Sequence, residues 1–217
     1  MNALTISLAY LRHRLLSTFL SVLTFASGIA VIVALLLTNA QLNDEFTKNL
    51  KGIDLVVGGK GSPMQLILSS VFHLDIPTGN IPLEEAEVLE HHPLVKSAIP
   101  LALGDNYNGF RIVGTDPDYI NHYHGSFVQG QVFSQSMEAV IGSDVAAKYH
   151  NKPGDEIVGA HGLVNSDDLH TDFPYTVVGI LAPTHTVLDR LVLTPVESVW
   201  HVHEHPDEDE RHHQHHQ

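Results

Sequence analysis

The longest apolar run in the chain lies near its amino end. Residues 15–43 contain no Asp, Glu, Lys, Arg or His. A bilayer core about 30 Å thick needs about 20 apolar residues in a helix, which pairs its backbone N–H groups internally. The pattern therefore predicts one transmembrane helix over residues 15–43. The alternative is a cleaved secretory signal, whose apolar core would span only about 7–15 residues; here the densest part, residues 29–37, lies late and continues into Thr38 and Asn39.

The residues before this run indicate its orientation. Arg12 and Arg14 stand directly at its amino boundary. A long domain is translocated largely regardless of its own charge, so short basic flanks tend to remain inside. We expect residues 1–14 in the cytoplasm and the large domain outside. This flank is either an interfacial helix that touches a cytoplasmic partner or the helical lead-in to the span, since three leucines share one helical face: Leu4, Leu8 and Leu11.

Helical spacing continues beyond the run. Leu42, Phe46 and Leu50 recur every four residues among charged neighbours. This spacing predicts that the membrane helix extends outward over residues 41–51 as a stiff stalk that ends at Gly52. Such an extension would couple the membrane part mechanically to the domain outside.

The pattern after the stalk alternates short strands with short helices. Apolar or alternating segments predict strands at residues 53–57, 95–103, 109–114, 137–141, 156–158, 173–181 and 190–194, with a hairpin turn at 104–106. Helical spacing and start signals such as Asp116 before Pro117 predict helices at residues 63–72, 83–91, 115–119 and 142–149. Because no regular parallel-sheet rhythm is present, the fold class expected is an α+β domain on a single N-terminal transmembrane helix.

Composition narrows the function of that domain. The chain has 217 residues, a formal charge of −14, no cysteine and 17 histidines. Nucleic acid is excluded as a partner because its phosphates require clustered Lys and Arg. The absence of cysteine excludes disulfides, a thiolate nucleophile and any Cys-ligated zinc or iron–sulfur site. About 170 residues beyond the membrane segment are enough for a real hydrophobic core.

A glycine-rich stretch at residues 58–62 superficially suggests a phosphate-binding loop. The match fails because a P-loop requires G-x-x-x-x-G-K-[ST], whereas Lys60 is followed by Gly61, Ser62 and Pro63. A turn into a helix with Pro63 at its first position explains the stretch better.

A hydrolase site is equally poorly supported. Three serines lie near His73 in the sequence: Ser62, Ser69 and Ser70. There is no G-x-S-x-G nucleophile elbow and no placed partner carboxylate. We therefore expect that the protein is not an enzyme.

The carboxyl end carries the sharpest chemical signal. Seven histidines are interleaved with Asp and Glu: His201, His203, His205, His212, His213, His215 and His216. An extended or a helical backbone would each bring imidazoles together, and neutral imidazole suits zinc, copper and nickel. We expect several weak, exchangeable Zn²⁺ ions in this tail rather than one closed tetrahedral site. The alternative is a solvated loop or a purification artefact.

Several segments, taken in order, resemble MacB/FtsX/LolC-type ABC transporter permeases. After the first span these are GIDLVVG at residues 52–58, GTDP at 114–117, VIG at 140–142 and YTVVGIL at 175–181. The segment PVESVW at 195–200, as a helix, fits the end of that family's core domain. The resemblance implies the division 1–14 cytoplasmic flank, 15–43 transmembrane helix, 44–200 MacB-like periplasmic core domain and 201–217 tail or loop. Such permeases continue into three further membrane helices, which do not follow here, so we expect a fragment rather than a degenerate copy.

The resemblance also implies a function. The chain would be a permease subunit in the bacterial inner membrane, binding no ATP itself and no catalytic cofactor. Its partners would be a separate cytoplasmic ABC ATPase, a second permease copy or paralogue, the lipid bilayer and a periplasmic protein. With the histidine tail as a periplasmic loop, zinc or another metal is the expected cargo. The alternatives are a membrane-anchored periplasmic metal-binding protein and, with less support, a tethered hydrolase.

Overall fold

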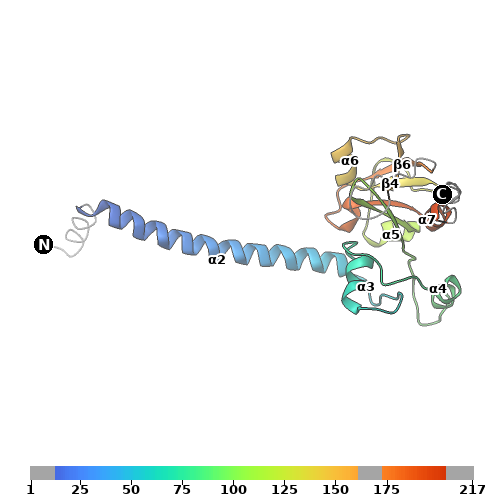
Figure 1. The fold of residues 1–217 in the computed structure, drawn as a ribbon, viewed down its shortest axis with the longest axis horizontal. Coiled ribbons are helices and arrows are strands. Elements are labelled where there is room, and N and C mark those ends of the chain that lie inside the picture. The colour runs from blue at the N-terminus through green and yellow to red at the C-terminus, as the bar shows by residue number, and fades with distance from the viewer. Residues whose placement is uncertain (1–12, 161–172, 204–217) are drawn as a thin grey trace, which may run out of the picture. The chain divides into compact units, whose positions relative to one another are not determined.

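The computed structural model describes residues 13–160 and 173–203 (Figure 1). Contacts divide the chain into two compact units, Met1–Lys48 and Asn49–Gln217, which are described separately. The first unit is dominated by helix α2, which runs from Leu15 to Leu50 and so contributes its last two residues to the second unit. Its 36 residues span about 54 Å. It is apolar and long enough to cross a membrane, and its extension to Leu50 confirms the predicted stalk.

The second unit, the core domain, is built on one mixed sheet. Within the described residues its strands are β1 (Ala102–Tyr107), β2 (Phe110–Thr115), β3 (Phe127–Gly130), β4 (Glu138–Ile141), β5 (Glu156–Ile157), β6 (Tyr175–Leu181) and β7 (Leu191–Pro195). The order is β1-β2-β7-β4-β6-β3, with β5 paired to β6. The pairs β2–β7 and β4–β6 are parallel and the other pairs are antiparallel. This mixture of helices and a mixed sheet confirms the α+β class.

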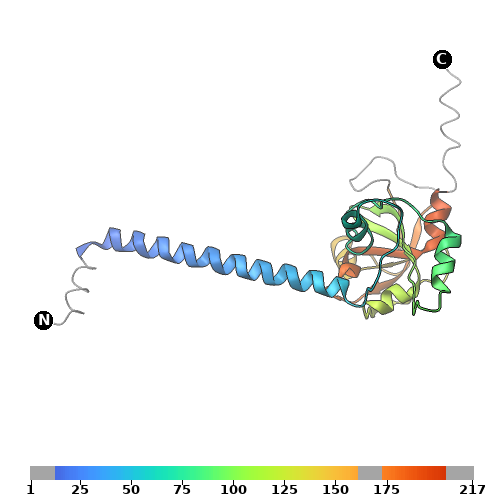
Figure 2. The same cartoon turned by 90° about the horizontal axis from the view of Figure 1, so that it is seen from below.

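Helices cover both faces of the sheet (Figures 1 and 2). They are α5 (Pro117–His122), α6 (Ser143–Tyr149), the 3₁₀ helix η1 (Val187–Arg190) and α7 (Val196–His203). Alternate strand residues point to opposite sides: Val140 and Leu193 pack with α5 and η1, whereas Ile141 and Val192 pack with Val145 of α6. Full burial of side chains on both faces gives the domain its hydrophobic core.

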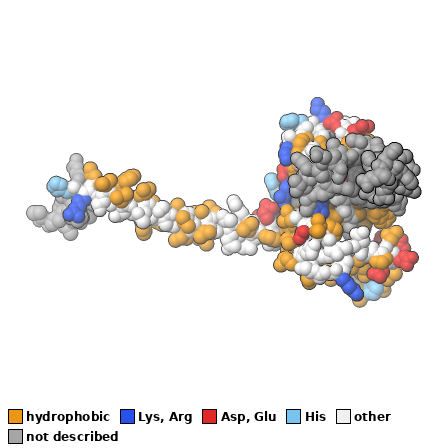
Figure 3. Space-filling model, in the orientation of Figure 1, with side chains coloured by type: hydrophobic (Ala, Val, Ile, Leu, Met, Phe, Trp, Pro, Cys, Tyr) orange, Lys and Arg blue, Asp and Glu red, His pale blue; other side chains and the backbone are white. Residues whose placement is uncertain are grey.

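Two helices lie in the stretch between α2 and β1. Helix α3 (Pro63–Ser70) begins as predicted, with Pro63 in the first turn and the Ser62 hydroxyl accepting from the Gln65 N–H. Helix α4 (Leu83–Glu90) carries no buried residue. The stretch leaves several apolar side chains exposed, including Met64, Leu74 and Val88. Hydrophobic side chains are also visible along α2 in Figure 3, as a membrane-spanning helix requires.

The other predicted helices are confirmed and several strands are in place. Asp116 caps α5 by accepting from the Asp118 N–H at 2.9 Å. Strands β4, β6 and β7 lie within or beside the predicted ranges, while β3 was not predicted. Its four residues are too short to give a clear pattern, and they are strand because they pair with β6.

Two predicted strand segments are wrong. Residues 53–57 form no strand, and Leu55 is 77% exposed although a buried strand was expected. A strand needs a neighbouring backbone to satisfy its polar groups, and the described residues provide none here. Residues 95–101 are also outside β1; Pro100 lies there and has no N–H to donate to a sheet.

The hairpin turn is also displaced from its predicted position. Residues 104–106 belong to β1, where the pairing register shifts between Leu103 and Asn106. The chain reverses instead at Asn108 and Gly109, whose φ angles of 50° and 89° are both positive. Positive φ at both central residues is what a tight two-residue hairpin turn requires, and Asn-Gly is its preferred pair.

Candidate functional site

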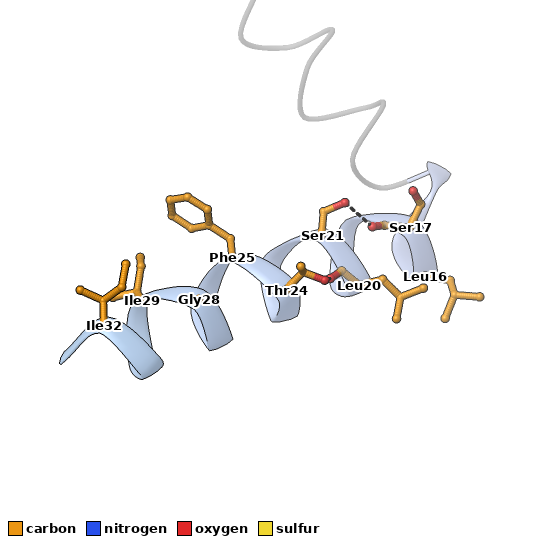
Figure 4. A pocket seen from close by; sticks show the side chains of 9 residues that line it. All are labelled: Leu16, Ser17, Leu20, Ser21, Thr24, Phe25, Gly28, Ile29 and Ile32. Carbon is orange, nitrogen blue, oxygen red and sulfur yellow. Dashed lines mark hydrogen bonds between the residues drawn. The ribbon is translucent and has the colours of Figure 1, made fainter. Parts of the chain in front are cut away.

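The membrane part of α2 has a shallow groove along one side (Figure 4). Large apolar side chains line most of it, together with four small or hydroxylated residues: Ser17, Ser21, Thr24 and Gly28. The Ser21 hydroxyl donates to the Ser17 carbonyl at 2.9 Å, and the Thr24 hydroxyl donates to the Leu20 carbonyl at 2.8 Å. Because these hydroxyls are satisfied within the helix, the groove is compatible with a hydrocarbon environment.

The outer end of α2 carries a buried polar residue, Asn49. Asn49 is 5% exposed and is the one buried residue of α2, every residue of which is described. Its side-chain oxygen accepts the Val187 N–H at 2.9 Å, and its backbone oxygen accepts the Tyr123 hydroxyl at 3.1 Å. All three residues belong to the core domain. Asn49 therefore bonds to two separate elements of that domain, η1 and the carboxyl end of α5.

Gly52 makes a further contact with α5. Its φ of +82° is a left-handed conformation, which glycine adopts without strain. A Cβ at this position would lie 3.1 Å from Cε1 of His122. The ring of His122 in turn meets Tyr123 edge-on, with 4.8 Å between the centroids. Because Gly52 has no side chain, the backbone that follows α2 can pass close to α5.

The η1 segment that receives Asn49 is itself held by a buried carboxylate. Asp189 is 6% exposed and accepts three hydrogen bonds. The donors are the Thr184 N–H at 2.8 Å, the Thr184 hydroxyl at 2.8 Å and the His185 N–H at 2.7 Å. Three donors on one carboxylate hold the loop between β6 and β7 in a single conformation. The Val187 N–H is consequently held in a fixed position, from which it donates to the Asn49 side chain.

A second buried polar group lies next to α5. His73, which follows α3, is 7% exposed, and its Nε2 is 2.7 Å from the Tyr119 hydroxyl. Burial away from water, reinforced by the Arg111 guanidinium, lowers the pKa of His73 from 6.5 to about 3. Burial also raises the pKa of Tyr119 well above its ordinary value. Both side chains are therefore neutral at physiological pH. Nδ1 of His73 and Nε and Nη2 of Arg111 are buried without a hydrogen-bond partner.

The glycine-rich stretch has a packing role. A Cβ on Gly59 would lie 2.8 Å from the backbone of Gly79, and the Thr78 hydroxyl donates to the Gly59 carbonyl at 2.7 Å. Glycine is needed here so that two backbone segments can approach each other.

The serines near His73 do not form a nucleophilic site with it. The hydroxyls of Ser69 and Ser70 both donate to the Leu66 carbonyl, one turn back along α3. The Nε2 atom of His73 is bonded to Tyr119 instead. A serine nucleophile would need an imidazole nitrogen within hydrogen-bond reach.

Most of the predicted metal-binding residues lie outside the described residues. This holds for His205, His212, His213, His215 and His216. The backbone is helical through His201 and His203, at the end of α7. Within the described part of the chain, no group of three or more His, Asp or Glu side chains could hold a metal ion. Metal binding by the tail remains a prediction.

Comparison with protein families identifies the core domain. The family model described as the MacB-like periplasmic core domain matches residues 18–214. The chain belongs to this family. The protein is thus a MacB/FtsX-type ABC transporter permease, as its resemblance implied. It is membrane-anchored through α2, with its core domain outside the cytoplasm.

Three solved structures are similar to parts of the chain. One is the periplasmic region of MacB from Actinobacillus actinomycetemcomitans, with 15% identity, a TM-score of 0.46 and coverage of 74% of this chain and 75% of that one. Another is the extracellular domain of the noncanonic ABC-type transporter YknZ from Gram-positive bacteria, with 15% identity, a TM-score of 0.43 and coverage of 58% and 67%. A domain of a putative permease from Porphyromonas gingivalis has 17% identity, a TM-score of 0.38 and coverage of 51% and 50%. A search of curated proteins found no match.

Sequence reasoning missed the polar residues that this site depends on. Asn49 stands among residues with stalk-like helical spacing, and His73 was considered only as a partner for serines. One local signal was available for Asn49: it is an uncharged polar residue between the charged Lys48 and Lys51, just before the helix-ending Gly52. No local signal pairs His73 with Tyr119, because 46 residues separate them.

Proposed function

We propose that this chain is the permease subunit of an ABC transporter that couples a separate cytoplasmic ATPase to the core domain outside the membrane. One observation carries the coupling part of the proposal. A single helix includes both the membrane-spanning run and Asn49, which is buried in the core domain. Movement produced in the membrane can therefore reach η1 and α5 without crossing a flexible linker.

The composition of α2 supports transmission of movement. After Gly28 the helix contains neither Gly nor Pro up to Leu50. Sharp kinks in helices occur mostly at Pro, at Gly and Ser pairs or at local bulges, so this half is expected to behave as a stiff rod. About 30 Å of its length suffices for the hydrocarbon core, which leaves about 24 Å outside it.

The cargo we propose is zinc or a related divalent metal. The support is the histidine- and acid-rich sequence at residues 201–217, which in this type of permease would be a periplasmic loop before the next membrane helix. Imidazoles and carboxylates in a flexible segment would collect exchangeable metal ions near the membrane. Under this proposal the protein resides in the bacterial inner membrane, pairs with a second permease copy or paralogue, and passes metal to or from a periplasmic partner.

Metal flux in membrane vesicles tests the transporter. The protein is reconstituted with its ATPase subunit, and movement of radioactive zinc is followed with ATP or a non-hydrolysable analogue. ATP-dependent flux that disappears when the ATPase cannot hydrolyse ATP is expected. Flux of the same size with either nucleotide would contradict the proposal.

Calorimetry tests the metal site separately. The full chain is compared with a chain lacking residues 201–217. Zinc binding should be lost with the tail and should fade between pH 7.5 and 5.5, because protonated imidazole cannot donate its lone pair. Equal heats from both chains would remove the tail from the mechanism.

The second candidate is a membrane-anchored metal-binding protein with no ATPase partner. The same histidine-rich sequence favours it, and the two candidates differ in one measurement. If the anchored-protein alternative holds, zinc binds to the tail but no ATP-dependent flux accompanies it. Co-purification with an ATPase subunit from the membrane would favour the permease.

A further inference from the structure

Helix α4 has little packing of its own. Each of the other described helices of the core domain buries at least one residue, whereas none of the eight residues of α4 is buried. Isolated helices shorter than about 12–15 residues are only marginally stable in water, and helices in proteins are stabilised mainly by packing of one face. Helix α4 therefore lacks the contacts that normally stabilise a helix of its length.

The two sides of α4 differ in character. Ala86 and Leu89 are half-buried and lie three residues apart on one side. The opposite side carries Glu84, Glu87 and Val88, which are exposed and share that side through spacings of three and four residues. Val88 is 68% exposed. The outward side of α4 thus presents an apolar side chain beside two carboxylates, and acidic and hydrophobic side chains lie next to each other over this helix (Figure 3).

The charge on α4 is not balanced. Half of its residues are glutamate, and it contains no Lys or Arg: Glu84, Glu85, Glu87 and Glu90. None of these glutamates forms an ion pair with a described residue. Like charges three residues apart, as in Glu84 and Glu87, destabilise a helix. Burial raises the pKa of Asp116 at the start of α5, and repulsion by Asp118 and Glu90 adds to the rise. Several carboxylates therefore gather near α4 and repel one another.

These charges decide which kind of partner fits the outward side of α4. In a two-fold symmetric dimer the same patch meets itself, which would bring glutamates against glutamates. Contact with another surface of a second copy is also unfavourable, because the chain carries a formal charge of −14. Anionic lipid headgroups would be repelled for the same reason. The complementary surface is one that carries Lys or Arg together with an apolar side chain.

We propose that α4 is a docking site for a basic segment of another protein outside the cytoplasm. Resting on the proposed function, this segment belongs to the periplasmic partner of the permease. Val88 packs against an apolar side chain of the segment, and Glu84 and Glu87 pair with its Lys or Arg residues. Pairing removes the repulsion between the glutamates, so α4 becomes more stable when the segment binds.

Site-directed crosslinking of the full chain in native membranes tests this proposal. The chain has no cysteine, so Val88→Cys provides a single thiol for a photoreactive crosslinker. We expect a crosslink to a different protein, at a segment that mass spectrometry identifies and that carries net positive charge. Adding Glu84→Gln and Glu87→Gln should lower the yield about threefold to tenfold, as loss of two exposed ion pairs predicts. The matched control, Asp144→Asn with Glu156→Gln, makes the same change in net charge at exposed positions outside α4 and should leave the yield unchanged.

Hydrogen–deuterium exchange with a defined probe gives a second measurement. The full chain in nanodiscs of zwitterionic lipid is mixed with an amphipathic peptide of Lys and Leu. The peptide should slow amide exchange in residues 83–90, and 1 M salt should abolish the effect because it screens exposed charges. The same peptide with Glu in place of Lys should leave exchange in this range unchanged.

Several results would overturn the proposal. Crosslinks only to lipid or to a second copy of the chain would do so, as would the absence of any protein crosslink or a crosslinked segment without net positive charge. A yield that stays the same in Glu84→Gln with Glu87→Gln, or that falls equally in the control, would remove the α4 glutamates from the interaction. Equal slowing of exchange by the basic and acidic peptides would do the same.

Transport separates this proposal from the proposed function. If the wild type shows no ATP-dependent zinc flux, the proposed function fails, and the crosslinks still decide whether α4 docks a basic segment. If the wild type transports zinc but the thiol at position 88 gives no crosslink to a basic segment, the docking site fails alone.

Discussion

Acidification should destabilise the core domain through His73. In the folded domain its pKa is about 3, whereas the exposed side chain of an unfolded chain has a pKa near 6.5. Between these two values the unfolded state binds the proton and the folded state does not, so stability falls as the pH falls. The contribution is fully present above pH 6.5 and is lost progressively toward pH 3.

The size of this loss follows from the two pKa values. Linkage gives about 2 kcal/mol of lost unfolding free energy at pH 5 relative to pH 7.5. The loss is not reduced by solvent screening, because His73 is 7% exposed. Against a total of about 5–15 kcal/mol for an ordinary domain, it is large enough to measure.

Urea denaturation of the full chain in detergent micelles provides the assay. Trp200 is the single tryptophan and lies in α7 of the core domain, so its fluorescence reports on that unit. Wild type and His73→Gln are unfolded at pH 7.5 and pH 5. The difference between the two proteins should shrink by about 2 kcal/mol at the lower pH, because only the wild type loses the His73 contribution.

A control substitution and the pH dependence of the stability difference test whether His73 causes the loss of stability. His91→Gln, at an exposed position where the ring contacts the Glu87 carbonyl, is the matched substitution. A difference between wild type and His73→Gln that stays constant from pH 7.5 to pH 5 would refute the reasoning. The same pH-dependent difference for His91→Gln would show that loss of any histidine produces it.

Three further predictions concern the path from the membrane to the core domain. Replacing Phe46 and Thr47 by Gly-Pro should cost about 4 kcal/mol of local helix and abolish ATP-dependent flux at normal membrane levels; undiminished flux would show that the stalk carries no signal. Asn49→Leu leaves the buried Val187 N–H unpaired and should lower the unfolding free energy by about 1–3 kcal/mol in urea titrations, whereas Asn49→Asp keeps an acceptor and should lose less; equal losses would contradict this role for the side-chain oxygen. Asp189→Ala removes the acceptor of three hydrogen bonds and should cost about 3 kcal/mol in the same titration, and wild-type stability would contradict the hydrogen-bonded loop.

Local chemistry was enough to predict much of the architecture. The start of α3 follows from Ser62 and Pro63, and the start of α5 from Asp116, because capping acts over three or four residues. Strands β6 and β7 follow from continuous apolar runs that suit a sheet buried on both faces. The family resemblance depends on these same local segments in their order.

Strand pairing and turn position required the tertiary structure. The run at residues 53–57 has the composition of a buried strand, but no neighbouring backbone among the described residues pairs with it, and Leu55 faces outward. The sequence Gly-Asp-Asn at 104–106 is typical of a turn, yet the chain reverses at Asn108 and Gly109. The reason is that the pairing of β1 with β2 fixes the register of the hairpin.

The run of residues 15–43, which carries no charge, was enough by itself to predict a helix that begins at Leu15 and is long and apolar enough to cross a membrane. This was possible because length and hydropathy are local properties of the sequence. The tertiary structure alone decided that Asn49 is buried, that it meets Val187 138 residues away, and that His73 meets Tyr119. Hydrogen bonds between such distant residues depend on how the whole sheet brings α5 and η1 together. No periodicity in the sequence encodes that juxtaposition, because the free energy that creates it comes from packing of the hydrophobic core around those elements.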